Sequence, residues 1–206
     1  KLVKDFRSIA VLPVIFKLYV RAMHMLAEKT CDRLISAQSG FRKFHQAREV
    51  VFIVRQMVDR AVEWKAPQVF IMDGDINKAY DFASHVAFAE AARSSGMHEV
   101  LVHAWLREWR RMTSAFRLDA EATSAEATRT RSLPPGDPAA PMILNLALDT
   151  IAEKFIHTAV EKEWGMRLQD KSWANLILFA HNYWLVATSP SMLSDMKSGG
   201  KPRRKT

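Results

Sequence analysis

The chain has 206 residues, of which 49% are hydrophobic and 25% are charged, and its formal net charge is +8. This composition is typical of a folded globular protein, and no run approaches the roughly 18 consecutive apolar residues of a membrane span. A single cysteine, Cys31, excludes an internal disulfide and a cysteine-rich zinc site, which suits a reducing compartment. We therefore expect a soluble intracellular protein with no membrane partner, either nuclear or cytoplasmic.

The positive charge is concentrated at the C-terminal end. Five Lys and Arg residues lie in the last ten positions, and the rest of the chain carries a net charge of only +3. Charge alone is therefore weak support for a nucleic-acid partner. Residues 197–206 contain little apolar surface, and we predict a disordered basic tail there, after a domain that spans residues 1–196.

The hydrophobic pattern predicts an α+β fold. Apolar residues recur at helical spacing over 14–29 and 47–64, and a polar, glycine-containing loop separates these two stretches. Residues 68–73 are apolar and β-rich and lie between Pro67 and Gly74, which predicts a buried strand. The elements predicted further along the chain are helices over 84–94 and 98–112, a hairpin formed by 114–119 and 128–133, a helix over 140–164, and a hairpin formed by 175–180 and 183–189 with its turn at His181–Asn182. This order is not the strict alternation of a βαβ fold.

Four sequence blocks carry a resemblance when they are taken together. They are FRSIAVLPVIFKLYVRAM from Phe6, AQSGFRKFHQARE from Ala37, MDGDINKAYDFASH from Met72 and LPPGDPAAPMILNLALD from Leu133. In this order they resemble the reverse transcriptase domain of non-LTR (LINE-type) retrotransposons, and the last two look like motifs A and B of that family. The resemblance implies the fingers and palm of a right-hand polymerase, and we expect the thumb to be absent.

The resemblance implies a magnesium site built from carboxylates of motifs A and C. A polymerase of this kind uses two Mg²⁺ ions, which prefer carboxylate and phosphate oxygens. Asp75 matches the motif A ligand, and Ile76 matches the residue whose backbone helps to hold the metal. Asp73 lies two positions earlier, so that in a continuing strand it faces the same side and is a possible auxiliary ligand.

The resemblance also implies contacts to the incoming deoxynucleotide and the template. Tyr80 matches the aromatic steric gate that disfavours ribonucleotides, and Arg42 and Lys43 match basic residues that contact the triphosphate or the template. Gly136 and Asp137 match the motif B loop near the nucleotide. Each residue type also has a structural alternative, namely a turn or helix-cap aspartate, a core aromatic or a solvated charge.

Three positions depart from the family pattern. The block LILFAHNYWLVATS falls where motif C belongs, but His181 and Asn182 stand in place of its two aspartates. Asparagine offers Mg²⁺ only a neutral oxygen, and imidazole prefers softer metals. A loss on the order of 4 kcal/mol of transition-state stabilisation lowers the rate about a thousandfold. Pro135 also replaces the glutamine expected in motif B. We therefore expect impaired Mg²⁺ binding and little or no polymerase activity.

The sequence leaves several functions open. The first is an inactive reverse transcriptase fragment of a retroelement, whose family partners are an RNA template, a DNA primer and a deoxynucleotide. The second is a working polymerase in which other carboxylates substitute. The third is a non-catalytic RNA- or DNA-binding module that retains the fingers and palm groove. A transition-metal site of His181, Asp75 and Asp73 is a further alternative, although it has no recognised acid–base partner.

Overall fold

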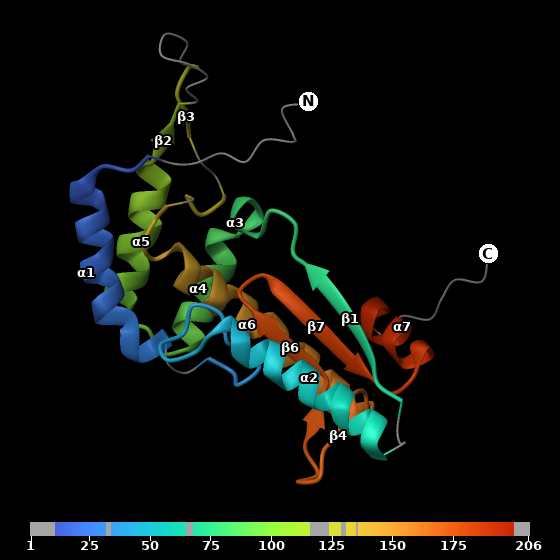
Figure 1. The fold of residues 1–206 in the computed structure, drawn as a ribbon. Helices are drawn as coiled ribbons and strands as arrows, with labels where there is room; N and C mark the ends of the chain where they lie inside the picture. Colours follow the sequence, from blue (N-terminus) through green and yellow to red (C-terminus); the bar gives the residue numbers. More distant parts are fainter. Residues whose placement is uncertain are drawn as a thin grey trace. The chain divides into compact units, whose positions relative to one another are not determined.

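Figure 1 draws the computed structural model as a ribbon; it describes residues 11–31, 34–64, 68–115, 124–128, 131–134 and 136–199. The chain forms two compact units, each with buried hydrophobic residues of its own. The first unit combines residues 1–33 with 78–147, and the second combines residues 34–77 with 148–206.

Helices make up most of the first unit. Its elements are α1 (Val14–Cys31), α3 (Ala79–Phe82), α4 (His85–Ser94), α5 (Glu99–Arg111), the short strands β2 (Thr113–Ser114) and β3 (Ala127–Thr128), and the start of α6 (Ala140–Glu161).

Aromatic packing between α4 and α5 forms a core in the first unit. The Ser84 hydroxyl begins α4 by accepting a hydrogen bond from the Ala87 backbone N–H, as a helix N-cap does. Phe88 on α4 meets Trp105 and Trp109 on α5 edge-on, with ring centroids 5.8 and 5.0 Å apart. All three rings are buried. Such edge-to-face pairs add to the stabilisation that comes from burying apolar area.

The second unit is built on a three-stranded antiparallel sheet in the order β1–β7–β6. The strands are β1 (Phe70–Asp75), β6 (Leu176–Phe179) and β7 (Asn182–Ala187), and the unit also contains α2 (Ala47–Trp64), the end of α6, the short hairpin of β4 (Met166–Arg167) and β5 (Trp173–Ala174), and α7 (Pro190–Ser198).

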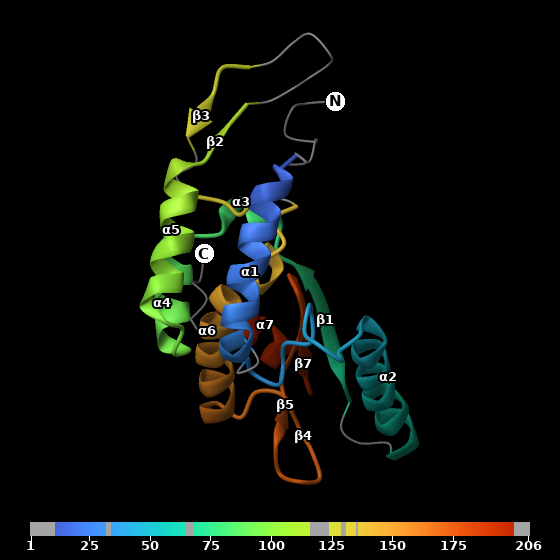
Figure 2. The ribbon, with the colours of Figure 1, turned by 90° about the vertical axis from the view of Figure 1, so that its left-hand side faces the viewer.

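Helices cover both faces of this sheet, because alternate residues of each strand point to opposite sides. Ile177 and Val186 pack with Val50 and Met57 of α2. Leu185 and Ala187 point the other way and pack in a cluster with Ala159 of α6 and Met196 of α7. Figure 2 shows α2 and α7 on opposite sides of β1 and β7. The sheet is therefore the middle layer of this unit.

Most of the predicted elements are present, with corrections at several of their ends. The first strand runs to Asp75 instead of ending before Gly74, because each of its residues pairs with β7. Asn182 opens β7, so that the turn lies at Ala180 and His181. Residues 197 and 198, predicted to belong to the tail, end helix α7; Gly199 closes this helix with a left-handed backbone. The first predicted hairpin is present but shorter, because Thr113 and Ser114 pair with Thr128 and Ala127, and residues 131–133 are not in a strand. Residues 116–119 and 129–130 of this hairpin, the remaining tail and the start of the first block lie outside the described residues.

Helices α3 and α7 and the β4–β5 hairpin were not predicted. Helix α3 and the two short strands are too brief for periodicity to identify. None of the described helices is both long enough and apolar enough to cross a membrane.

Candidate functional site

The end of β1 and the β6–β7 turn bring three predicted site residues together. Asp75 is the last residue of β1 and pairs in register with Asn182, the first residue of β7. His181 Nε2 lies 3.6 Å from Asp75 Oδ1, and about half of the Asp75 side chain (53%) is exposed. The Ile76 backbone N–H donates to the His181 carbonyl at 3.0 Å. Strand pairing therefore places Asp75, the predicted motif A ligand, directly beside His181 and Asn182, the residues predicted to replace the motif C aspartates.

Asp73 lies on the same face of β1 as Asp75, as the alternation of strand residues predicts, and both are exposed. Gly74 between them pairs with Tyr183, whose ring covers the opposite face of the strand. A Cβ atom at Gly74 would overlap this ring. Glycine therefore allows Tyr183 to pack across β1 while the two aspartates face the other side.

The donor set at this corner does not fit a catalytic pair of magnesium ions. Asp75 supplies one carboxylate, whereas its cross-strand neighbour Asn182 offers a neutral amide and His181 an imidazole. Within the described ranges, no cluster of three or more His, Cys, Asp or Glu side chains is arranged to hold a metal ion. Hard Mg²⁺ ions favour several oxygen donors with negative charge, which these three side chains do not provide.

The turn of the β6–β7 hairpin is held by the side chain of Gln38, which is completely buried (0% exposed). Its amide nitrogen donates to the Ala180 carbonyl at 3.2 Å. Its amide oxygen accepts from the backbone N–H groups of Gly40 and Ala180, each at 2.9 Å. A Cβ atom at Gly40 would overlap the backbone nitrogen of Ala180. Gln38 and Gly40 therefore fix the segment that precedes α2 against the turn that carries His181.

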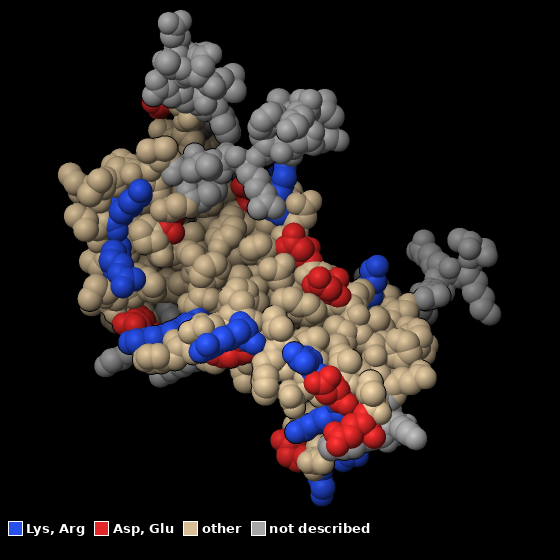
Figure 3. Space-filling view, viewed as in Figure 1, with Lys and Arg blue, Asp and Glu red and all other residues tan. Residues whose placement is uncertain are grey.

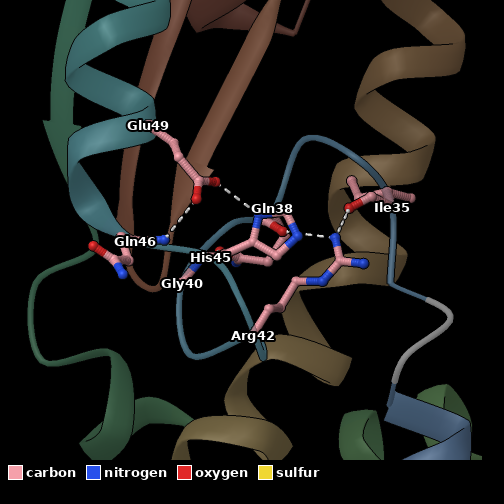
Figure 4. A network of polar contacts seen from close by, with 7 residues as sticks. All are labelled: Ile35, Gln38, Gly40, Arg42, His45, Gln46 and Glu49. Atoms are coloured by element: carbon pink, nitrogen blue, oxygen red, sulfur yellow. Dashed lines mark hydrogen bonds and ion pairs between the residues drawn. The ribbon is translucent and has the colours of Figure 1, made fainter.

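Arg42 braces the same segment, as Figure 4 shows. Its Nη1 donates to the carbonyl oxygens of Ile35 and Gln38 at 3.0 and 2.9 Å. On the other side of this peptide segment, the Ile35 N–H donates to Asp149 Oδ1 of α6 at 2.9 Å. Burial raises the pKa of the Asp149 carboxyl, and the hydrogen bond from Ile35 lowers it in part. The guanidinium of Arg42, which is predicted to contact the triphosphate or the template, therefore also holds the backbone of this segment in place.

The segment enters α2 through a second polar network, also drawn in Figure 4. Glu49 accepts from the Gln46 backbone N–H at 3.1 Å and lies 2.9 Å from His45 Nδ1. A glutamate three residues into the helix that bonds back to the first backbone N–H is part of a capping box.

Tyr80, Gly136 and Asp137 belong to the first unit. Burial raises the pKa of the Tyr80 hydroxyl, which is consistent with a half-buried ring. Gly136 is exposed and adopts φ of 98°, a left-handed conformation suited to glycine. Asp137 is buried, and its Oδ1 accepts from the Ala139 N–H at 2.8 Å in the turn that leads into α6. Pro135 lies outside the described residues.

Sequence reasoning does not identify the roles of Gln38, Gly40 and Asp149. The segment from Ser36 to Gln46 lacks apolar periodicity, and its composition predicts a polar loop. The only feature in the sequence that points to these roles is a glutamine followed by a glycine two residues later. A sequence alone does not reveal that this glutamine is buried.

Three kinds of comparison describe what this chain resembles. The family model for reverse transcriptase (RNA-dependent DNA polymerase) matches residues 1–194. No curated protein sequence gives a significant match.

Similar solved structures include three structures of telomerase from two species. The apo enzyme from Candida tropicalis aligns with a TM-score of 0.62 at 9% identity, over 89% of this chain and 33% of that chain. Telomerase from Candida tropicalis in complex with a TWJ fragment of telomeric RNA has a TM-score of 0.60 at 11% identity, over 90% and 29%. Telomerase from Candida albicans with the same kind of RNA fragment gives 0.58 at 8%, over 89% and 32%. The chain spans about a third of their length, and the likeness confirms the predicted α+β fold of fingers and palm.

Proposed function

Because the chain belongs to the reverse transcriptase (RNA-dependent DNA polymerase) family, we propose that it is a fingers and palm portion of a LINE-type retroelement enzyme with little or no polymerase activity. One observation carries the proposal of inactivity. The carboxylate of Asp75 lies beside His181 and Asn182 at the corner where the family has two further aspartates. Members of this family use divalent metal ions, and this donor set provides too little negative charge for them.

The LINE-type origin rests on the four sequence blocks and on their order. The proposed partners are an RNA template, a DNA primer and a deoxynucleotide. Two of the similar telomerases are seen with a fragment of telomeric RNA, which supports an RNA partner for this chain. Since the chain spans about a third of those structures, the activity of a whole enzyme is part of the proposal.

The proposed roles of the site residues follow the family motifs. Asp75 occupies the metal-ligand position, with Asp73 as an auxiliary on the same strand face and Ile76 beside it. The proposed nucleotide-binding residues are Arg42, Lys43, Tyr80, Gly136 and Asp137. The buried capping role of Asp137 makes its contribution indirect, through the shape of the loop that leads into α6.

A second candidate function is a non-catalytic nucleic-acid-binding module. The observation that favours it is the basic character of the segment that precedes and begins α2. Residues 40–56 contain four Arg or Lys residues and one Glu. Figure 3 shows basic side chains at the surface where α2 begins. This function needs the folded surface but not the carboxylates of motif C.

Primer extension on an RNA template with Mg²⁺ tests the first proposal. Three proteins are compared: the unaltered chain, the double variant His181→Asp/Asn182→Asp, and the double variant with Asp75→Ala added. We expect no extension by the first, extension by the second and none by the third. The expected gain is at least about a thousandfold, the equivalent of about 4 kcal/mol in the barrier.

The control variant replaces the His181 side chain with an uncharged one and so restores no negative charge at the turn. His181→Gln with Asn182 unchanged should remain inactive, because glutamine offers no carboxylate. Asp75-dependent extension by the unaltered chain would contradict the proposed inactivity. Silence from every variant would contradict the proposal that the two motif C substitutions are the cause.

A further inference from the structure

The turn between Gln38 and α2 presents two phenylalanine rings to solvent. Phe41 is 59% exposed and Phe44 is 89% exposed. Both residues have a left-handed backbone, with φ of 54° and 67°. Bulky residues rarely adopt this conformation, and exposed phenylalanines lose the benefit of burial. The turn therefore combines two features that are unfavourable for the isolated chain, and such strain concentrates at ligand-binding sites.

Basic residues lie close to these phenylalanines in the sequence, and one of them contacts a ring. Lys43 Nζ lies 5.6 Å from the centroid of the Phe44 ring, within the range of a cation–π contact. Arg42 lies between the two phenylalanines in the sequence, with its Nη1 hydrogen-bonded to the carbonyl oxygens of Ile35 and Gln38, and Arg48 lies in the first turn of α2. The one nearby acidic residue of the segment, Glu49, is engaged by His45 and by the Gln46 backbone N–H. A ligand that approaches the turn therefore meets aromatic faces and positive charge together.

The exposed face of α2 continues this arrangement. Arg48, Glu49, Phe52 and Ile53 line a surface hollow of about 530 Å³. Phe52 is 62% exposed. Arg48 and Phe52 are four residues apart on the helix and so share one face. Aromatic and basic residues thus alternate from Phe41 to Phe52.

Hydrogen bonds hold the backbone of the segment that contains Phe41 and Phe44 in place. Gln38 is bonded to the β6–β7 turn, and Arg42 donates to two backbone carbonyls of the same segment. A rigid support reduces the entropy lost when a ligand binds, since less of the protein has to become ordered.

We propose that Phe41, Phe44, Lys43, Arg48 and Phe52 bind an unpaired RNA strand, with bases stacked on the phenylalanine rings and phosphates near the basic groups. Interleaved aromatic and cationic side chains are the general means of binding single strands, since every base has a face that can stack. The excess of positive charge in residues 40–56, with four Arg or Lys and one Glu, favours a polyanionic ligand. The inference rests on the proposed function only for the class of ligand, a nucleic acid, and requires no catalysis.

Fluorescence anisotropy with two labelled oligomers tests the inference. One is an unstructured RNA of about 12 nucleotides, and the other is an abasic oligomer with the same number of phosphates. We expect the unaltered chain to bind the RNA about tenfold more tightly, because stacking requires bases. Binding by charge alone would give equal affinities.

Two substitutions of Phe44 identify the ring as the source of this difference. Phe44→Gly should abolish most of the preference for bases, while its thermal midpoint stays equal or rises because glycine adopts positive φ without strain. Phe44→Trp should retain the preference. The matched control is Phe82→Leu in the first unit, since Phe82 is also 59% exposed and lies beside an arginine, with Arg131 Cζ 5.1 Å from its ring centroid.

The inference is supported if Phe44→Gly removes the preference and Phe82→Leu keeps it. Equal affinity of the unaltered chain for both oligomers overturns it, as does an equally large effect of Phe82→Leu. Self-association that Phe44→Gly abolishes, without any preference for bases, also overturns it and identifies a protein-binding surface. Primer extension is measured in a separate experiment. If that experiment contradicts the proposed function, the anisotropy result can still be interpreted.

Discussion

Three backbone groups at the β6–β7 turn and in the segment before α2 depend on one side chain, that of Gln38. Its amide satisfies the N–H and carbonyl of Ala180 and the N–H of Gly40. Backbone groups that are buried without a partner are costly, because water cannot replace the missing hydrogen bond. The position of His181, the next residue in the chain, therefore depends on a glutamine more than 140 residues away.

Replacing Gln38 with leucine should destabilise the chain by about 3 kcal/mol, since leucine makes none of the three hydrogen bonds and their backbone partners stay buried. Urea unfolding measures this change in the free energy of unfolding. Gln169→Leu is the control, because Gln169 is exposed in the turn between β4 and β5. A Gln38→Leu variant as stable as the control would show that the turn holds its shape without the glutamine.

At the scale of elements, strand register and helix ends set the site. Antiparallel pairing of β1 with β7 places Asp75 opposite Asn182 and Gly74 opposite Tyr183. A shift of one residue would move both aspartates to the face that packs against α6 and α7, so burial of that face fixes the register. Helix α6 depends on Asp137, whose buried carboxylate caps the turn before it.

The carboxyl of Asp137 predicts a pH dependence of stability. Burial raises its pKa, and hydrogen bonds from the Ala139 and Ala140 N–H groups lower it in part. A carboxyl with a raised pKa in the folded state stabilises the fold while it is protonated, and this contribution is lost as pH rises from about 4 through the folded pKa. Asp137→Asn retains the capping oxygen but carries no charge. Its stability relative to the unaltered chain should therefore increase as pH rises.

Asp170 is the control, because its pKa is shifted in the opposite direction to that of Asp137. Hydrogen bonds from Ser172 lower the pKa of its carboxyl, so its contribution is present at neutral pH and is lost as pH falls. Asp170→Asn should therefore lose stability relative to the unaltered chain as pH rises. Urea unfolding between about pH 2 and pH 7 follows both variants, with the change for Asp170→Asn expected below about pH 4 and the change for Asp137→Asn expected above it. Parallel profiles for all three proteins would contradict the argument.

At the scale of the whole molecule, attraction by overall charge and the proposed recognition of bases belong to different parts of the chain. The net charge of +8 includes four basic residues within 200–206, whereas the aromatic and basic surface lies at the start of α2. Charge attracts any polyanion at low salt, and only the rings can distinguish bases from a bare backbone.

Removal of residues 200–206 should therefore weaken binding of the RNA and the abasic oligomer to the same extent. The dependence of affinity on salt should become shallower by up to about 0.7 in the logarithmic slope for each phosphate that the tail no longer neutralises. The ratio between the two affinities should not change. A ratio that falls to one after the truncation would assign the preference for bases to the tail, and anisotropy titrations at several salt concentrations decide the question.

The sequence by itself determined the order and type of the main elements and the identity of the family. Helical periodicity over 47–64 and the β-rich run before Asp75 are local patterns, and they need no knowledge of distant neighbours. The resemblance of the blocks around Asp75 and His181–Asn182 to motifs A and C of that family likewise implied that the two lie side by side.

Only the tertiary structure decided which polar residues are structural. Gln38 and Gly40 lie in a segment that looks like an exposed loop, yet one is buried and the other touches the backbone of Ala180. The extension of β1 through Gly74 follows from its pairing with β7 and from the ring of Tyr183. These features depend on contacts between residues more than 100 positions apart, and local propensity carries no information about such contacts.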